Sequence, residues 1–128
     1  MGRYVILILG VLLAFPLLCF TQDIHPALGV TVEVPFGFYA GEKMLPPGAY
    51  SITEGDLEDE VKITDLKSQE STKLQIFTRL GMRPDAEVLF DKVGDEYRLS
   101  EVYIPGLDGF LFKAAQGKHT HVHIRGKQ

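Results

Sequence analysis

The sequence predicts an all-β fold, preceded by an N-terminal signal helix. The preferred arrangement is a small antiparallel barrel-like meander of about eight short strands, and the alternative is a two-sheet β-sandwich. Apolar and polar residues alternate in many short runs, and Gly- or Pro-containing turns separate these runs. After position 21, no stretch of about twelve residues has the 3.6-residue period of a helix. Because short turns let successive strands pair with each other, we prefer the meander.

Residues 1–21 have the pattern of a secretory signal peptide. Arg3 is the only charged residue in this segment, and residues 4–20 are almost entirely apolar. The best cleavage position lies before Gln22, although the residues in front of it fit a signal peptidase poorly. An uncleaved membrane anchor is therefore an alternative, and lipidation at Cys19 is a weaker one. Cleavage would make the protein secreted or periplasmic.

The remaining chain has the length of one domain. Residues 22–28 are expected to form a flexible lead, and residues 29–128 a single β-domain. Loss of the signal segment removes Arg3 and no acidic residue, so the formal charge changes from −4 to −5. It also removes Cys19, the only cysteine, so no disulfide can stabilise the mature domain. A mildly acidic chain argues against nucleic acid as a partner, and a membrane partner is expected only if the signal segment is uncleaved.

The clearest strand pattern covers residues 30–38. Its apolar residues share one face: Val30, Val32, Val34, Phe36 and Phe38. We expect the last four of them to be buried together. Pro35 has no backbone N–H to donate, so this strand should lie at an edge or contain a bulge. Turns are expected at residues 40–43 and 46–48, where Gly and Pro occur.

Further runs with the same alternation follow. Their apolar positions are Tyr50 and Ile52, Val61 and Ile63, Leu74 and Ile76, Val88 and Phe90, Tyr97 and Leu99, Val102 and Ile104, Phe110 and Phe112, and Val122 and Ile124. Residues 93–96 have the pattern of a tight hairpin turn. Between Leu99 and Val102 the apolar parity changes, which predicts a bulge near Ser100 and Glu101.

Two motifs resemble those of a known family. The first consists of Pro35, Phe36, Phe38, Gly41, Lys43, Leu45, Pro46, Gly48 and Tyr50, and the second of Gly94, Asp95, Tyr97, Leu99 and Val102. Together they resemble small exported bacterial β-rich proteins of unassigned function. The resemblance implies export and a β-rich fold, and it carries no known activity, cofactor or catalytic residue. The chain departs from that pattern at its histidine-containing C-terminal end.

Three histidines near the C-terminus are the candidate metal ligands. His119, His121 and His123 alternate along one expected strand, so their imidazoles should point to the same side. Neighbouring imidazoles can share Zn²⁺, which accepts nitrogen ligands. The preferred interpretation is nevertheless a solvated basic face, with Val122 and Ile124 packed inward and no cofactor bound. Contact with an anionic surface is a third possibility.

Other residue groups give weaker signals. The acidic loop at residues 54–60 could attract Ca²⁺, but it lacks the EF-hand spacing, and we expect a solvated loop. The aromatic residues could line an apolar cavity, but in a domain of this size they more often fill the core. No serine lies in a nucleophile-elbow sequence, and no Gly-rich phosphate loop is present in the sequence.

The sequence therefore favours a non-enzymatic exported β-domain that acts by binding or by structural contact in the bacterial cell envelope or outside the cell. The alternative is a carrier of a small apolar ligand or of a divalent metal. Its partner would be an envelope or extracellular protein, or a small ligand.

The signal segment gives a direct prediction. We expect the exported protein to be soluble and to begin near Gln22, because Pro16 interrupts the apolar run and no cationic flank follows before Lys43. The intact mass and N-terminal sequence of the exported protein would test this. Membrane-bound protein that retains residues 1–21 would show an uncleaved anchor instead.

Overall fold

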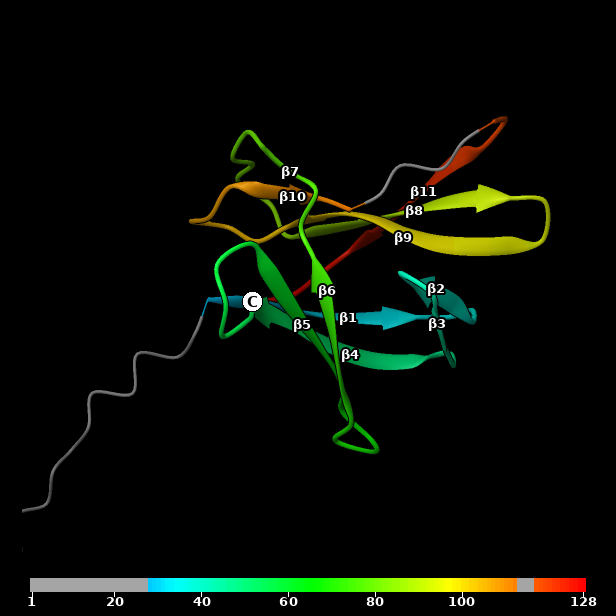
Figure 1. Cartoon of the computed structure of the whole chain (residues 1–128), viewed down its shortest axis with the longest axis horizontal. Coiled ribbons are helices and arrows are strands. Elements are labelled where there is room, and N and C mark those ends of the chain that lie inside the picture. The colour runs from blue at the N-terminus through cyan, green and yellow to red at the C-terminus, as the bar shows by residue number, and fades with distance from the viewer. Residues whose placement is uncertain (1–27, 113–116) are drawn as a thin grey trace, which may run out of the picture.

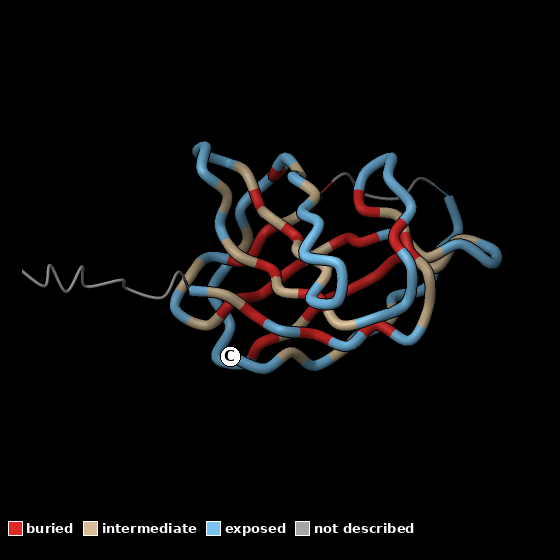
Figure 2. Tube along the Cα trace, turned by 90° about the horizontal axis from the view of Figure 1, so that it is seen from below, coloured by how far each residue is buried: buried red, intermediate tan, exposed pale blue. Residues whose placement is uncertain are grey.

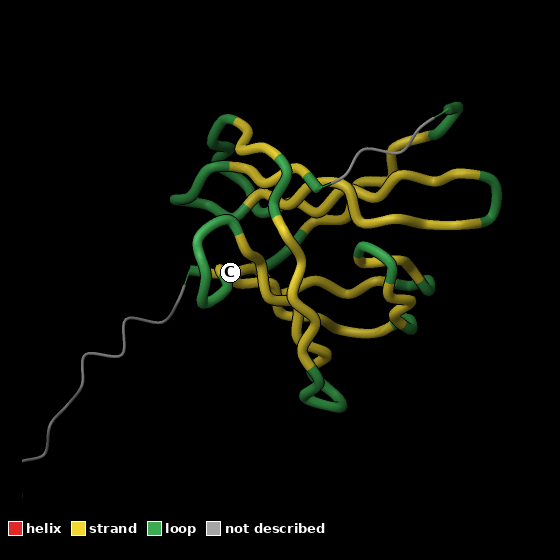
Figure 3. The backbone as a smooth tube through the Cα atoms, viewed as in Figure 1, coloured by secondary structure: helices red, strands yellow, loops and turns green. Residues whose placement is uncertain are grey.

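The computed structural model describes residues 28–112 and 117–128, and all of their regular structure is strand (Figure 3). The expected signal segment, residues 1–21, and residues 22–27 of the lead lie outside the described residues. No helix long and apolar enough to cross a membrane occurs in the described ranges. The strands of those ranges are β1 Gly29–Val34, β2 Phe38–Ala40, β3 Lys43–Leu45, β4 Gly48–Glu54, β5 Glu60–Asp65, β6 Ser71–Gln75, β7 Thr78–Leu80, β8 Glu87–Val93, β9 Glu96–Tyr103, β10 Gly109–Leu111 and β11 Thr120–Arg125.

These strands form two sheets (Figure 1). The smaller sheet has the order β1-β4-β5-β6, and the larger one has the order β11-β8-β9-β10-β7, with the β2–β3 hairpin attached to β9. The all-β prediction is confirmed. The preferred barrel is wrong in that the sheets do not close, and the two-sheet alternative describes the arrangement better. Eleven strands, rather than about eight, occur in the described ranges.

Several strand pairs join distant parts of the chain, which a simple meander does not predict. β1 pairs with β4, β7 pairs with β10, and β11 pairs with β8. The two sheets approach each other at two corners. At one corner Thr31 and Lys127 exchange two backbone hydrogen bonds of 2.7 and 2.8 Å, and at the other the Phe77 N–H donates to the Leu111 carbonyl at 2.9 Å. A Cβ on Gly126 would lie 2.0 Å from Val30 Cγ2, so the first corner requires glycine.

One hydrophobic core lies between the sheets, and Figure 2 shows the buried residues in red along the strands. Both sheets contribute to it. Its buried members are Val30, Val32, Val34, Phe38, Ala40, Leu45, Tyr50, Ile52, Val61, Ile63, Ile76, Ala86, Val88, Phe90, Leu99, Val102, Ile104, Phe110 and Phe112. The Phe38 ring lies 5.2 Å from that of Tyr50 and 5.1 Å from that of Phe90, both in edge-to-face geometry. Aromatic side chains therefore fill the centre of the domain.

The predicted nine-residue strand at 30–38 is divided in two. β1 ends at Val34, the chain bends at residues 35–37, and β2 starts at Phe38. Pro35 and Gly37 are the first and last residues of the bend, which fits their low preference for regular strands. The expectation that Phe36 is buried with its neighbours is therefore only partly correct: Phe36 is half-buried and packs against the rim of the core.

The predicted bulge is confirmed. Leu89 pairs with Glu101 and Phe90 pairs with Leu99, so Ser100 is the extra residue on β9. Its carbonyl accepts a hydrogen bond of 2.8 Å from the Phe112 N–H. The extra residue exchanges the two faces of β9, so Glu101 points away from the core.

Two phenylalanine substitutions test this packing. Phe38→Ala should lower the free energy of unfolding by about 3–5 kcal/mol, because Phe38 is 1% exposed. Phe36→Ala should cost roughly half as much, because the ring is half-buried and stacks on Tyr97 at 3.7 Å between centroids. Urea unfolding of both variants would measure the difference. An equal or larger loss for Phe36→Ala would show that Phe36 contributes as much to the core as Phe38 does.

Candidate binding surface

The two faces of β8 differ in chemistry. Val88 and Phe90 belong to the core, so the alternating residues Glu87, Leu89 and Asp91 point to the outer face of the larger sheet. Leu89 is 5% exposed and Asp91 is 2% exposed. A carboxylate on an outer face can be buried only if other side chains cover it. This outer face is therefore packed, unlike an ordinary solvated face.

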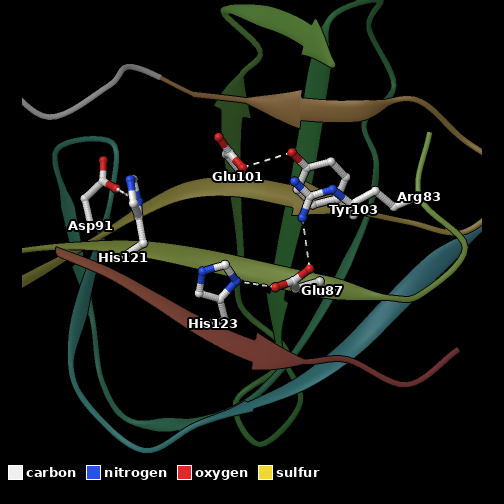
Figure 4. Close-up of polar contacts among 7 residues, drawn as sticks. All are labelled: Arg83, Glu87, Asp91, Glu101, Tyr103, His121 and His123. Atoms are coloured by element: carbon white, nitrogen blue, oxygen red, sulfur yellow. Dashed lines mark hydrogen bonds and ion pairs between the residues drawn. The ribbon is translucent and has the colours of Figure 1, made fainter. Parts of the chain in front are cut away.

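The packed side chains come from three neighbouring strands and from the connection before β8. Cross-strand pairs in an antiparallel sheet share a face, and the registers place His121 opposite Asp91 and Tyr103 opposite Glu87. Figure 4 shows the resulting group of side chains. We call this group the outer-face cluster; it consists of Arg83, Glu87, Asp91, Glu101, Tyr103, His121 and His123.

Five members of the cluster form a continuous chain of contacts (Figure 4). The Tyr103 hydroxyl donates to the Glu101 carboxylate at 2.9 Å, and the Arg83 guanidinium lies 3.9 Å from the centre of the Tyr103 ring. Arg83 also donates to Glu87 at 3.1 Å. The second oxygen of Glu87 contacts Nδ1 of His123. The cluster is thus held by charge-assisted hydrogen bonds and a cation–π contact.

These contacts shift the pKa values of Glu87 and Tyr103. The hydrogen bond from His123 lowers the pKa of Glu87, and the neighbouring Arg83 adds to this effect, while partial burial opposes it. Burial raises the pKa of Tyr103, and its hydrogen bond with Glu101 raises it further. Glu87 is therefore held as a carboxylate and Tyr103 as a neutral phenol.

The other two members, Asp91 and His121, form a second group with His119. His121 Nδ1 lies 3.0 Å from Asp91 Oδ1, and the His119 and His121 rings are 5.0 Å apart between centroids. His119 Nδ1 contacts the Gly117 carbonyl at 2.9 Å. Each of Asp91, His119 and His121 offers a potential metal-ligand atom, and these three atoms all lie within 4.8 Å of one another.

The structure therefore divides the three candidate histidines of the sequence between two groups of contacts. All three are exposed, while Val122 and Ile124 pack against the core, so the predicted parity of β11 is confirmed. His119 and His121 lie together, but His123 contacts Glu87 instead of completing a three-histidine set.

Sequence reasoning missed Asp91. Asp91 follows the core residue Phe90 on a strand, and successive side chains of a strand point to opposite faces, so the sequence could have indicated that Asp91 points away from the core. The pairing of β8 with β11, which brings it to His121, involves segments about 30 residues apart. Local patterns do not specify such a pairing.

Two basic side chains contact three carboxylates of the acidic loop. Lys73 lies 3.7 Å from Asp56 and 3.8 Å from Glu60, and Arg79 lies 3.2 Å from Asp59. The loop lines an open hollow of about 260 Å³. Because basic side chains already face three of these carboxylates, we expect this hollow to be a poor cation site.

A second hollow, of about 250 Å³, lies beside the β2–β3 hairpin and includes Lys43, Asp65 and Glu70 in its lining. Tyr50 borders it and donates its hydroxyl to the Pro46 carbonyl. Burial raises the pKa of Tyr50, and the nearby Asp65 raises it further. Its lining is mixed, because Met44, Leu45 and Ile63 lie there beside the charged residues.

The Glu87 contacts give a pH-dependent prediction. Because the folded-state pKa of Glu87 lies below its ordinary value of 4.5, ionised Glu87 stabilises the fold above that pH, and the contribution is lost as pH falls through the folded-state pKa. Glu87→Gln should therefore lower the stability by about 1 kcal/mol at pH 7 and by much less near pH 3. Thermal unfolding at both pH values would measure this.

The matched control is Glu96→Gln, which removes an exposed carboxylate from a surface pair with Arg98. It should have a smaller effect at pH 7, because exposed pairs contribute little. A Glu87→Gln loss of equal size at both pH values would contradict the assigned role of the carboxylate charge.

Comparisons of the chain with protein-family models, curated proteins and solved structures find no match.

Proposed function

We propose that this protein is an exported, non-enzymatic binding domain that contacts its ligand through the outer-face cluster. The observation that carries this proposal is the burial of Asp91 and Tyr103, which are 2% and 4% exposed, on a face directed away from the core. Burying charged and polar groups costs free energy, and a stable sheet does not require it. A prearranged polar surface is what a binding site for a polar or charged ligand needs.

The core supports binding at this surface rather than inside the domain. Phe38, Phe90 and Phe110 are each no more than 1% exposed and occupy the space between the sheets. Sites for small organic molecules usually enclose about 300–1,000 Å³ and are mostly apolar. The two hollows described above are smaller than this, and both have charged residues in their linings, although the second also has apolar ones. An apolar-ligand carrier is therefore the less favoured alternative.

The pKa shifts of Glu87 and Tyr103 favour binding over acid–base catalysis by these two groups. General acid–base catalysis works best with a group whose pKa lies near the working pH. The pKa of Glu87 is lowered and the pKa of Tyr103 is raised, so both move away from neutrality. Such groups keep fixed protonation states, which suits recognition of a ligand by charge and hydrogen bonding.

Export is proposed from the sequence. The apolar segment at residues 4–20 and the resemblance to small exported bacterial proteins both support a secreted or periplasmic location. The partner would be an envelope or extracellular protein, or a small polar ligand. The acidic net charge makes nucleic acid an unsuitable partner.

Native mass spectrometry of the full chain, exported from a bacterial host and extracted without detergent, tests this proposal. The wild type should retain a bound partner or ligand. The double variant Arg83→Ala/His121→Ala should lose it, because both halves of the outer-face cluster are then disrupted. Lys67→Ala, an exposed change in the turn between β5 and β6, is the control and should retain it.

Circular dichroism would establish that the double variant is folded. Retention of the same bound species by a folded double variant would contradict the proposed surface. A protein that carries no bound species, or one that remains in the cytoplasm, would contradict the proposal as a whole.

A further inference from the structure

We propose that Asp91, His119 and His121 form a three-ligand site for a divalent transition-metal ion. This inference rests on the proposed function, since it assigns a ligand class to one end of the same surface. It replaces the three-histidine set suggested by the sequence, because His123 is held by Glu87 and a carboxylate from β8 takes its place.

The distances suit a tetrahedral metal ion. Zn²⁺ binds nitrogen and carboxylate oxygen at about 2.0–2.2 Å, so two ligand atoms of a tetrahedral site lie roughly 3.3–3.5 Å apart. His121 Nδ1 and Asp91 Oδ1 are 3.0 Å apart. An ion could take the place of the hydrogen between these two atoms if they separate by a few tenths of an ångström. The ligand atom of His119 lies within 4.8 Å of both, which a side-chain rotation can shorten.

The backbone just before His119 orients its ring for this role. A carbonyl can only accept a hydrogen bond, so the contact with the Gly117 carbonyl places the proton of neutral His119 on Nδ1. Its Nε2 then carries the free lone pair. Metal-binding histidines usually have such a partner on the other ring nitrogen, which fixes the tautomer and the ring orientation.

The surroundings are also suitable in charge and access. Asp91 is 2% exposed, and a bound cation would interact favourably with its carboxylate. The His121 side chain is 52% exposed, so solvent or a partner could supply the fourth ligand. Arg125 lies four residues further along β11, roughly 13 Å away at the rise of a strand. Arg98 is the cross-strand partner of Asp91 on β9, so its charge could repel a cation at this site. Arg98 is paired with Glu96 at 3.2 Å, which weakens this repulsion.

The donor set indicates which metals would bind. Two imidazoles and one carboxylate suit Zn²⁺, Ni²⁺ and Cu²⁺, whereas Ca²⁺ and Mg²⁺ prefer sites made of oxygen atoms. No cysteine lies among the described residues to favour a softer ion. The site should therefore discriminate strongly between Zn²⁺ and Ca²⁺.

Calorimetric titration of the tag-free full chain with Zn²⁺ alone tests the site. One ion should bind per chain at this site, and an equal concentration of Ca²⁺ should give no binding there. His119→Ala and His121→Ala should each weaken Zn²⁺ binding about 10–100-fold, the loss usual even for outer-shell partners of a metal. His123→Ala removes an imidazole from the same face of the same strand, and it should change the affinity less than about twofold.

Asp91→Asn should also weaken binding by at least about tenfold, because it removes the carboxylate charge with little change of shape. Should this buried variant fail to fold by circular dichroism, the exposed His119→Ala variant still decides the question. An effect of His123→Ala as large as that of His121→Ala would overturn the proposed ligand set. Equal affinity of the wild type and all variants would overturn the site.

The two proposals can fail separately. In one outcome, these substitutions leave the Zn²⁺ affinity unchanged, while the Arg83→Ala/His121→Ala variant still loses its retained partner. The metal site is then wrong, and the proposed binding surface stands. If the titration behaves as expected while the chain remains in the cytoplasm, the metal site stands and the proposed export fails.

Discussion

The register of β8 against its two neighbours is the constraint on which the rest of the structure depends. β8 pairs with β9 on one side and with β11 on the other, so its alternation assigns a face to residues of all three strands. Val88 and Phe90 enter the core because of this register, and Glu87 and Asp91 meet the side chains of the outer face. A slip of one residue would exchange these sets and bury two carboxylates among phenylalanine rings.

The bulge at Ser100 makes this register compatible with β9. Without the extra residue, Leu99 and Val102 could not both face the core, because they are an odd number of positions apart. With it, Glu101 and Tyr103 reach the outer face beside Glu87. Bulges are frequent next to functional sites because they redirect side chains, and here the redirected side chains form one end of the outer-face cluster.

Local patterns in the sequence predicted the features that depend on neighbouring residues. The alternation of β11, the turn at residues 93–96 and the Ser100 bulge follow from period-two hydrophobicity and turn chemistry. The pairing of β11 with β8 depends on packing between distant segments, so the partnership of Asp91 with His121 could not be predicted. Pro35 predicted an edge strand or a bulge, and β1 does lie at the edge of its sheet. The division of the strand at residues 35–37 was not predicted, because the alternation of apolar residues continues through it.

The basic side of β11 satisfies two requirements at once. Charged residues on an edge strand hinder edge-to-edge association, and Arg125 and Lys127 lie on that side of the strand end. His119 and His121 lie at the other end, where Asp91 faces them from β8. A metal ion there would link the edge strand to its neighbour. The core is complete without such an ion, so binding would add only the free energy of ligand linkage to the stability. If the proposed site binds a metal ion, that separation of folding from ligand binding would let the outer face change its ligand without loss of the fold.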